Sequence, residues 1–455
     1  MLEQKRFHFV GIGGAGMSAL ALLLLQAGKK VSGSDLQMSS YAQRVKKQGA
    51  KIFLGHHPSN LRDAEIVIFS SAISLDNPEL RLAREKNIPL MHRGELLADL
   101  LKDKMSIAVS GMHGKTSVAN MLATALLRAD YQPCVALGGE SFDIEGNAYL
   151  GKDPYFVAEA DESDGSFLHL SPTYAIITNI EPEHLNFYKS EEKIIAAFLQ
   201  FSRKVKEVIF YNGEDRNTKR ALEELESSKK VSFGFLPEND IFAKNIQENG
   251  IVTSFDCFFK QEKLGRIEIP LLGRYNVANC LAAIGVSLHL GLDFKKLEES
   301  FRNYKGVARR GEIKRRDEIL LVEDYAHHPT EIAAVISSYL PIKKNRGGRI
   351  ITIFQPHRYT RTKSLAKDFG RCFEKVDLII LTDIYPASEK PIPGVSTDLI
   401  SEAINEKEGP PTVLLPKDEI VDYLKGIVRK GDIIMVLGAG DIGELSGELA
   451  RIKIR

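Results

Sequence analysis

Residues 106–120 (SIAVSGMHGKTSVAN) constrain the fold of this chain more than any other stretch, because a strand pattern runs directly into a glycine turn and an apolar helix. Such a turn aims several backbone N–H groups and the positive end of the helix dipole at one point, which suits a phosphate group. Lys115 adds a cation for the outer phosphates, and the Thr116 hydroxyl is a ligand that Mg²⁺ accepts. The residues expected to hold ATP are Gly111, Met112, His113, Gly114, Lys115, Thr116 and Ser117.

The turn departs from the common P-loop pattern, which places four residues between its two glycines. Only Met112 and His113 separate Gly111 from Gly114, and Val109 occupies the place of the usual first glycine. A glycine turn between two core elements, without a ligand, is the alternative interpretation. The succession of strand, turn and helix favours the phosphate site.

The first hundred residues alternate between strand and helix patterns, as in a doubly wound α/β domain. We expect strands at 6–11, 30–34, 65–72 and 88–91, and helices at 15–27, 77–87 and 94–101. The first turn spells GxGxxG from Gly11 to Gly16, and Asp35 follows the second strand at about the 20-residue spacing of a dinucleotide fingerprint. This pattern places a pyrophosphate on a helix N-terminus and an acid near a sugar hydroxyl. Both NAD and a UDP-sugar meet that description.

The chain length and the order of the patterns predict three domains, at about residues 1–103, 104–311 and 312–455. The central domain has strand patterns at 133–137, 155–160, 174–179, 208–211 and 231–235, and a helix pattern at 276–290. Residues 251–272 alternate like an antiparallel hairpin with its turn near Gly265. Strands of the third domain are expected at 319–324, 350–354, 378–382, 412–415 and 433–437.

Acidic residues follow the strand predicted at 155–160, at the sheet edge where α/β proteins bind ligands. We therefore expect Glu159 near the phosphate loop, with the acids of residues 161–164 (DESD) directly after it. The polar end of the next strand leads to His184, which would lie beside Glu159 if the two strands are neighbours. A hydroxyl, a carboxylate and an imidazole can hold Mg²⁺ between phosphate oxygens and a second substrate. A solvated acidic loop and a histidine without a ligand are the alternatives.

Two polar clusters follow strands of the third domain, EDYAHHP at 323–329 and QPHRYTR at 355–361. Arginine binds a carboxylate with two parallel hydrogen bonds, and an acid or an imidazole suits an ammonium group. Together the clusters predict an amino-acid pocket. A histidine-based zinc site is the alternative, but the adjacent arginines would repel the ion.

Net charge, apolar runs and cysteine content argue against nucleic-acid-binding, membrane-spanning and disulfide-bonded classes of protein. A net charge of +1 gives no electrostatic basis for a nucleic-acid or anionic-membrane partner. The longest apolar run, Leu20–Leu25, is far short of the roughly 20 residues that span a bilayer. The four cysteines form no CxxC pair, which favours a reducing compartment. We expect a cytoplasmic protein without membrane insertion, as a monomer or a weak homodimer.

Eight short stretches, taken together and in this order, resemble the Mur ligases, the ATP-dependent amide-forming enzymes of bacterial cell-wall synthesis. They are GIGGAGM (11–17), SSAI (70–73), GMHGKT (111–116), VAEADESDGSFL (157–168), TNIEPEH (178–184), DYAHHPTEI (324–332), FQPHRYTRT (354–362) and GAGDIG (438–443). The resemblance covers essentially the whole chain and is closest to the branch that adds L-alanine to UDP-N-acetylmuramate. It implies a Rossmann-like UDP-sugar domain, a central P-loop-type ATPase domain with a mixed sheet, and a C-terminal Rossmann-like domain that brings the amino acid.

The resemblance also implies roles for individual residues. ATP would contact the glycine loop and Asn276, Asn279, Arg310 and Asp324. The Mg²⁺ ligands, with Mn²⁺ expected to substitute, would be Thr116, Glu159 and His184. The UDP-sugar would contact Gly13, Gly14, Ala15, Gly16, Met17, Asp35, Ser70 and Ser71. The amino acid would contact Tyr325, His327, His357, Arg358 and Arg361, and the catalytic groups would be Lys115, Glu159, His184 and His327.

The implied reaction begins when the lactoyl carboxylate of UDP-N-acetylmuramate attacks the γ-phosphate of ATP, giving an acyl phosphate and ADP. The amine of L-alanine then displaces phosphate, with His327 as the candidate base. The sequence departs from the alanine-adding enzymes at four positions, Met112, Ser117, Tyr275 and Glu323, and Tyr275 leaves the adenine contact open. Other Mur ligases carry a carbamylated lysine about a dozen residues after the position of His184. Residues 194–198 (IIAAF) contain no lysine at the matching place, so the resemblance to the alanine-adding branch implies no carbamylated lysine here.

Three other functions remain open at this point. Within the family, the alternative is a ligase that joins UDP-N-acetylmuramate to a recycled tripeptide. The first glycine turn alone is also compatible with an NAD-dependent dehydrogenase, and the phosphate loop with a non-catalytic ATP-driven binding protein. For the ligase, we expect domain closure about residues 102–105 and 310–314 to exclude water from the intermediate.

Overall fold

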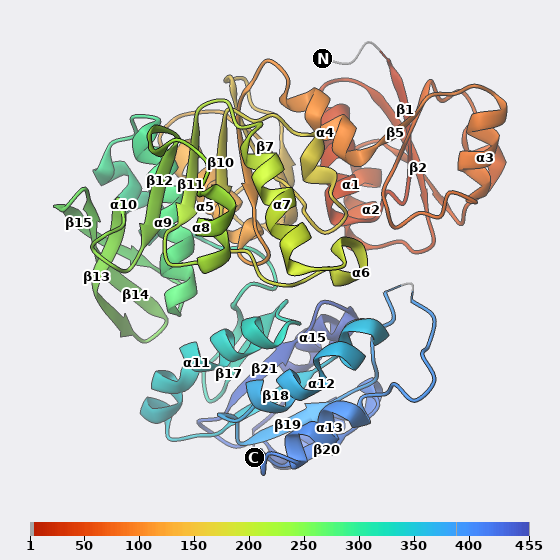
Figure 1. Cartoon of the computed structure of the whole chain (residues 1–455). Coiled ribbons are helices and arrows are strands. Elements are labelled where there is room, and N and C mark those ends of the chain that lie inside the picture. The colour runs from red at the N-terminus through yellow and green to blue at the C-terminus, as the bar shows by residue number, and fades with distance from the viewer. Residues whose placement is uncertain (1–3, 388, 455) are drawn as a thin grey trace. The chain divides into compact units, whose positions relative to one another are not determined.

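The computed structural model describes residues 4–387 and 389–454, which form an α/β protein built on three β-sheets (Figure 1). The predicted fold class is therefore confirmed. The chain divides into two compact units, the first comprising Met1–Ile246, Ser254–Ile269 and Val277–Val307, and the second comprising Gln247–Thr253, Pro270–Asn276 and Ala308–Arg455. The boundaries of the three predicted domains stay a prediction, and their outer ends, residues 1–3 and 455, lie outside the described residues.

The first sheet has five parallel strands in the order β3-β2-β1-β4-β5. Its elements are β1 (Arg6–Val10), α1 (Ala15–Gln26), β2 (Lys30–Asp35), α2 (Ser40–Lys47), β3 (Lys51–Leu54), η1 (Pro58–Asn60), β4 (Ile66–Phe69), α3 (Pro78–Glu85), β5 (Leu90–His92) and α4 (Arg93–Leu101). The strand order reverses between β2 and β4 around β1, which is the place where such sheets bind ligands. The sequence analysis missed α2, which buries only two residues, and β3, an edge strand without a fully buried residue.

The second sheet has ten strands in the order β15-β14-β13-β12-β11-β10-β6-β9-β7-β8. Its elements are β6 (Met105–Ser110), α5 (Lys115–Arg128), β7 (Cys134–Ser141), β8 (Gly146–Tyr149), β9 (Tyr155–Glu159), η2 (Ser166–His169), β10 (Tyr174–Ile177), α6 (Leu185–Tyr188), α7 (Glu191–Ser202), β11 (Val208–Asn212), α8 (Arg216–Leu222), η3 (Ser227–Lys229), β12 (Lys230–Gly234), β13 (Ile241–Asn249), β14 (Val252–Phe259), β15 (Glu262–Ile269), α9 (Arg274–His289) and α10 (Phe294–Arg302). The sheet is mixed, because β8 runs antiparallel to β7 at one edge. The phosphate-loop strand β6 lies between β9 and β10, so the condition that these two strands are neighbours is not met.

The hairpin predicted near Gly265 turns elsewhere. The two-residue turn at Lys260 and Gln261, both with positive φ, joins β14 to β15, and Gly265 lies within β15. A Cβ atom at Gly265 would come within 2.6 Å of Phe294 and Glu298, so the glycine allows helix α10 to approach the strand. The prediction of the turn was wrong because this glycine serves packing between elements.

The third sheet has six strands in the order β16-β17-β21-β18-β19-β20, of which only the edge strand β16 is antiparallel to its neighbour. Its elements are β16 (Glu312–Arg316), β17 (Leu320–Asp324), α11 (Pro329–Arg346), β18 (Ile350–Phe354), α12 (Tyr359–Cys372), β19 (Leu378–Leu381), α13 (Asp398–Asn405), β20 (Thr412–Leu414), η4 (Lys417–Glu419), α14 (Ile420–Ile427), β21 (Ile433–Leu437), η5 (Asp441–Leu445) and α15 (Ser446–Leu449). The five strands predicted for this region are all present within a residue or so of the expected bounds.

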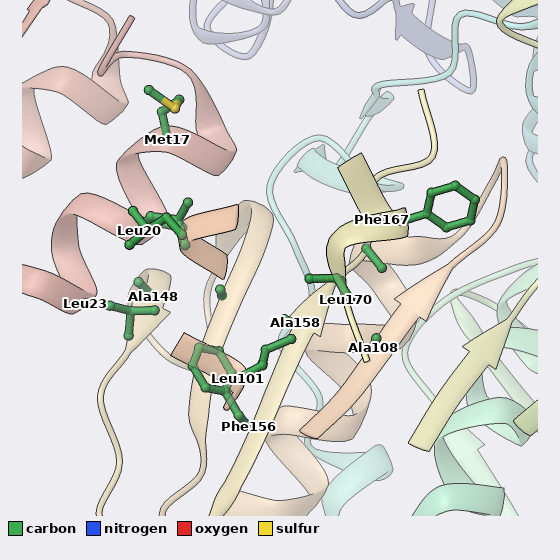
Figure 2. Close-up of a cluster of buried hydrophobic side chains, with 14 of the residues drawn as sticks. Met17, Leu20, Leu23, Leu101, Ala108, Ala148, Phe156, Ala158, Phe167 and Leu170 are labelled. Atoms are coloured by element: carbon green, nitrogen blue, oxygen red, sulfur yellow. The ribbon is translucent and has the colours of Figure 1, made fainter. Parts of the chain in front are cut away.

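A single buried core joins the first two sheets within the first unit. Figure 2 shows Leu20 and Leu23 of α1 near Ala148 of β8, with Phe156 of β9 and Leu101 of α4 completing the cluster. Residues 102–105, the first of the two predicted hinges, therefore lie inside one compact unit. Helix α1 contains the longest apolar run, and no helix among the described residues is long and apolar enough to cross a membrane.

Candidate functional site

The glycine loop between β6 and α5 has the backbone that a phosphate site requires. Gly111 has φ +127° and Gly114 has φ +86°, conformations that favour glycine. Neighbouring side chains leave no room for a Cβ atom at either position. A Cβ at Gly111 would lie 2.1 Å from Thr178 Oγ1, and one at Gly114 would lie 2.5 Å from Asn279 Oδ1. Asn279, predicted to contact ATP, thus lies directly at the loop.

The loop is tied to the end of β10 by backbone and side-chain hydrogen bonds. The N–H of His113 donates to Asn179 Oδ1 at 3.0 Å, and the N–H of Met112 donates to the Asn179 carbonyl at 3.1 Å. Thr178 Oγ1 donates to the His113 carbonyl at 2.6 Å. The motif TNIEPEH therefore shapes the loop from the neighbouring strand, while the Met112 side chain is buried in the core.

Lys115 lies at the first turn of α5, with its ammonium group held inside the protein. Its Nζ donates to the carbonyl of Gly111 at 2.5 Å and to Glu162 Oε1 at 2.9 Å. Burial by itself would lower the pKa of Lys115, but the carboxylates of Glu162 and Asp161 outweigh it and raise that pKa. Lys115 is therefore a permanent cation at the phosphate loop.

The predicted metal ligands fall into two adjacent groups. Thr116 Oγ1 donates to Glu159 Oε2 at 3.1 Å, as expected from the position of Glu159 at the end of β9. His184 is paired with another acid, since its Nε2 lies 3.6 Å from Oε1 of the buried Glu162. No role for Glu162 was predicted from the sequence. Glu162 lies in the loop after β9, where no strand or helix pattern indicates which side chains are buried.

The oxygen atoms at the loop fit a magnesium ion. Glu162 Oε2 is buried and has no hydrogen-bond partner among the residues that the structure describes. Buried polar atoms without partners are rare in folded proteins and commonly mark the place of a water or an ion. A hydroxyl oxygen on Thr116 and carboxylate oxygens on Glu159 and Glu162 are donors that Mg²⁺ prefers.

The first glycine turn lies at the N-terminus of α1, with Asp35 folded onto it. The N–H of Gly13 donates to Asp35 Oδ2 at 2.8 Å, and Ser39 Oγ donates to the Gly13 carbonyl at 2.9 Å. Ser71, at the end of β4, donates to Asp164 Oδ2 at 2.6 Å. The Met17 side chain is buried and belongs to the shared core cluster, so only its backbone is available to a ligand.

The second unit brings together the two polar clusters predicted to form an amino-acid pocket. The rings of Tyr325 and His327 are 5.5 Å apart between centroids, and those of His327 and His357 are 5.7 Å apart. Arg361 Nη1 lies 3.3 Å from His357 Nδ1. Tyr385, which the sequence analysis missed, stacks on His357 at 5.6 Å with an interplanar angle of 13°.

Arg358 has a strained backbone at this cluster. Its φ of +74° and ψ of 137° lie in a region that residues other than glycine rarely adopt. The N–H of Arg358 donates to the Tyr385 carbonyl at 2.8 Å, and its own carbonyl accepts from Thr362. Strain that is held in this way clusters at functional sites, because it fixes the direction of a side chain.

Asp324 and the residues after it form a second polar group in this unit. Asp324 accepts the N–H groups of Gly311 at 2.6 Å and Ala326 at 2.8 Å. Burial raises the pKa of Asp324 to about 6, against the opposing effect of Arg310. The guanidinium of Arg310 lies 4.7 Å from the centroid of the Tyr325 ring. Tyr275 and Asn276 line a small pocket with Gly311, whose N–H donates to Asp324, and with Ile251, Pro270, Leu271, Leu272, Ile313 and Tyr339.

The glycine turn at 438–443 is closed by an arginine that the sequence analysis missed. Arg309 Nη2 donates to the carbonyls of Gly438 at 2.6 Å and Gly440 at 2.9 Å. A Cβ at Gly443 would lie 2.1 Å from Glu323 Oε1, which itself lies 3.0 Å from Arg309 Nε. These glycines therefore allow Gln355, Tyr385 and Glu323 to pack closely against the turn.

We expect the backbone strain at Arg358 to be measurable by comparing two substitutions. Arg358→Gly and Arg358→Ala both remove the side chain, but only glycine relieves the positive φ. Since such strain costs on the order of 1–3 kcal/mol, the glycine variant should unfold in urea with a free energy about 1 kcal/mol above that of the alanine variant. Equal stabilities would contradict the strained conformation.

The stability of the second unit should fall with decreasing pH in a way that depends on His357. Burial, followed by the electrostatic effects of His327, Arg361 and Arg358, lowers the pKa of His357 from 6.5 to about 2. Below pH 6.5 the His357 imidazole is therefore protonated in the unfolded chain but stays neutral in the folded chain. The free energy of unfolding consequently decreases as the pH falls. The loss approaches about 1.4 kcal/mol per pH unit.

The measurement is urea unfolding of the wild type and His357→Gln at pH 5 and pH 7. Glutamine cannot take up this proton, so the variant should lose less stability than the wild type between the two pH values. An identical loss in both proteins would mean that His357 is protonated in the folded state.

Comparison with known protein families and structures agrees with this geometry. Residues 6–105 match the sequence model described as "Mur ligase family, catalytic domain", residues 109–287 the "Mur ligase middle domain", and residues 309–440 the "Mur ligase, glutamate ligase domain". A UDP-N-acetylmuramate–L-alanine ligase of Dictyoglomus turgidum is 43% identical, over 99% of this chain and 97% of the relative. A protein of the same name from Geotalea daltonii is 42% identical, over 99% and 98% of the two chains.

Solved structures extend the similarity to three dimensions. The UDP-N-acetylmuramate-alanine ligase of Thermotoga maritima superimposes with a TM-score of 0.85 at 29% identity, covering 98% of both chains. A murein peptide ligase of Psychrobacter arcticus shares the fold, with a TM-score of 0.74 at 22% identity over 99% of this chain and 100% of that one. The family models, the full-length relatives and the phosphate loop all lead to the same conclusion: the chain belongs to the Mur ligase family.

Proposed function

We propose that this protein is an ATP-dependent ligase that joins L-alanine to the lactoyl carboxylate of UDP-N-acetylmuramate, releasing ADP and phosphate. The reaction forms an amide bond between an acid and an amino acid and serves peptidoglycan synthesis. The observation that carries the proposal is Lys115, held at a glycine loop by the buried Glu162, in a chain about 42% identical over its whole length to relatives named for this reaction. The bacterial cytoplasm is the expected location, because it supplies ATP and keeps the four buried free cysteines reduced.

The first step transfers a phosphoryl group, which depends mainly on positioning and charge neutralisation. The loop N–H groups and the N-terminus of α5 would face the phosphates of a bound nucleotide, and the Lys115 ammonium would neutralise the charge on their oxygens. Thr116, Glu159, Glu162 and His184 would hold Mg²⁺, which supplies further charge neutralisation when bound. The resemblance assigns the rest of the nucleotide to Asn276, Asn279, Arg310 and Asp324, and Tyr275 leaves the adenine contact open.

The second step needs a neutral amine. His327 Nδ1 lies 3.0 Å from the Tyr325 carbonyl, which accepts only from a protonated nitrogen, so Nε2 is the basic nitrogen of this ring. Arg358 and Arg361 would bind the amino-acid carboxylate, because a guanidinium matches its two oxygens. His357 stays neutral at physiological pH and adds no charge that would repel the ammonium group.

The UDP-sugar would be held at the first glycine turn, by Gly13, Gly14, Ala15, Gly16, the Met17 backbone, Asp35, Ser70 and Ser71. A dehydrogenase is not favoured, because the family model covers this turn together with the rest of residues 6–105. The tripeptide ligase is not favoured either, since the full-length relatives at 40–43% identity are named for L-alanine.

The test of substrate identity is phosphate release from ATP with UDP-N-acetylmuramate and a panel of acceptors. We expect L-alanine to give the highest kcat/KM, with glycine and L-serine slower and the tripeptide L-alanyl-D-glutamyl-diaminopimelate inactive. Faster turnover with the tripeptide would assign the protein to the recycling branch. Nicotinamide-dependent absorbance changes without ATP consumption would reject the ligase altogether.

Lys115→Ala should lower turnover by roughly 10²–10³-fold or more, because a preorganised charge at the phosphates is lost. The substitution also leaves the Glu162 carboxylate buried without its cation, which costs about 3–5 kcal/mol of stability. The double variant Lys115→Ala/Glu162→Gln removes that charge as well, so it should regain stability without regaining activity.

Lys206→Ala, at an exposed position between α7 and β11, is the matched control and should stay within about two-fold of wild type. Amide formation at wild-type rate in a folded Lys115 variant would contradict the assignment of the phosphate loop.

A further inference from the structure

Arg93 connects the first sheet to the acidic loop after β9. It is the first residue of α4, and its Nη2 atom donates to Asp161 Oδ2 at 2.8 Å, to Asp164 Oδ2 at 2.8 Å and to Ser166 Oγ at 3.2 Å. The sequence gives no sign of a role for this residue, because an arginine at a helix start is usually exposed. Its side chain is only 19% exposed.

The hydrogen bonds of Arg93 are all made by one of its three nitrogens. Within residues 4–387 and 389–454, the atoms Nη1 and Nε have no hydrogen-bond partner. Nη1 lies 3.5 Å from the position that a Cβ atom on Gly16 would occupy. The Nη1 side of the guanidinium, which makes no hydrogen bond to the described residues, therefore faces the start of α1, where the glycine turn ends.

The acids around Arg93 keep it charged and fixed. The carboxylates of Asp161 and Asp164 overcome the effect of burial and raise the pKa of Arg93 further. Burial would raise the pKa of Asp161, but Arg93 and Lys115 lower it well below its usual range. Asp161 is thus the shared neighbour of a cation at the first glycine turn and a cation at the phosphate loop.

Other polar groups bring the acidic loop to the same edge of the first sheet. Ser71, just beyond β4, donates to Asp164 Oδ2, and its Oγ lies 2.9 Å from Nε2 of His92 at the end of β5. The carboxyl ends of parallel strands are where α/β sheets bind their ligands. Arg93 therefore lies between the two candidate ligand sites of the first unit.

We propose that Arg93 binds an anionic oxygen of the nucleotide-sugar substrate through Nη1, while Nη2 remains on Asp161 and Asp164. The proposal rests on the proposed function, because it takes a diphosphate-linked sugar acid as the ligand at the first glycine turn. A charged hydrogen bond from a guanidinium that is already fixed costs little ordering entropy. Arg93 then directs the substrate from the glycine turn toward the phosphate loop.

Calorimetric titration of the full-length protein with two ligands tests the proposal. UDP-N-acetylmuramate carries both a diphosphate and a carboxylate, whereas UDP-N-acetylglucosamine carries only the diphosphate. We expect Arg93→Ala to weaken UDP-N-acetylmuramate at least ten-fold, and Arg93→Lys to weaken it less. A parallel loss for UDP-N-acetylglucosamine assigns the contact to the diphosphate, and a loss for UDP-N-acetylmuramate alone assigns it to the carboxylate.

The matched control is Arg44→Ala. Arg44, on α2, also reaches across to the β7–β8 segment, where it bonds to Glu140 and to the Glu145 carbonyl. Removing it should change the thermal midpoint without changing the affinity for either UDP-sugar. The KM for ATP should be unchanged in the Arg93 variants, which separates a substrate contact from a general disturbance.

The outcomes separate this inference from the proposed function. If the wild type binds neither UDP-sugar, the proposed function is rejected. If the wild type binds UDP-N-acetylmuramate and both folded Arg93 variants bind it equally well, Arg93 only ties the acidic loop in place and the inference is rejected.

Discussion

The ion pair between Lys115 and Glu162 is the interaction on which the site of the first unit depends. Two opposite charges in the protein interior are stable only as an ion pair, because the desolvation of a single unpaired charge costs several kcal/mol. Lys115 lies at the start of α5 and Glu162 lies in the loop after β9, so the pair fixes that loop against the phosphate-loop helix. A nucleotide that draws Lys115 toward its phosphates must therefore be accompanied by a new positive partner for Glu162.

The same need to pair buried charges explains why the acidic residues after β9 do not form a solvated loop. Asp161 and Asp164 are occupied by Arg93, and Glu162 by Lys115 and His184. Positive and negative side chains alternate from the first sheet to the phosphate loop. Such an arrangement lets two anionic substrates approach each other, because one can pair with Arg93 and the other with Lys115. The neighbouring carboxylates keep the net charge of the site from becoming strongly positive.

The sequence predicted the parts of this protein that local chemistry determines. Glycine turns that meet a strand and a helix, such as Gly111–Gly114, were recognised because few other residues adopt their backbone. The strands β17, β18, β19 and β21 of the third sheet were predicted because parallel strands buried on both faces are largely apolar runs. The edge elements β3 and β16 were missed because they bury too little apolar surface to leave a pattern.

What the sequence could not provide was the pairing of side chains across elements. The spatial order of β9, β6 and β10 places His184 with Glu162, and nothing in the spacing of these residues distinguishes Glu162 from Glu159. Arg93, Arg309 and Tyr385 are likewise defined only by neighbours distant in the chain. Their roles depend on tertiary contacts, which local periodicity does not encode.

The division of the chain into two units has a consequence for how the protein can be dissected. The second unit is discontinuous in the sequence, because Gln247–Thr253 and Pro270–Asn276 belong to it although they precede Ala308. Leu272, from the second of these segments, is buried in the core of that unit. A fragment expressed from Ala308 onward would expose part of this core to water, so autonomous folding of the C-terminal third would require the two short segments to be supplied from elsewhere.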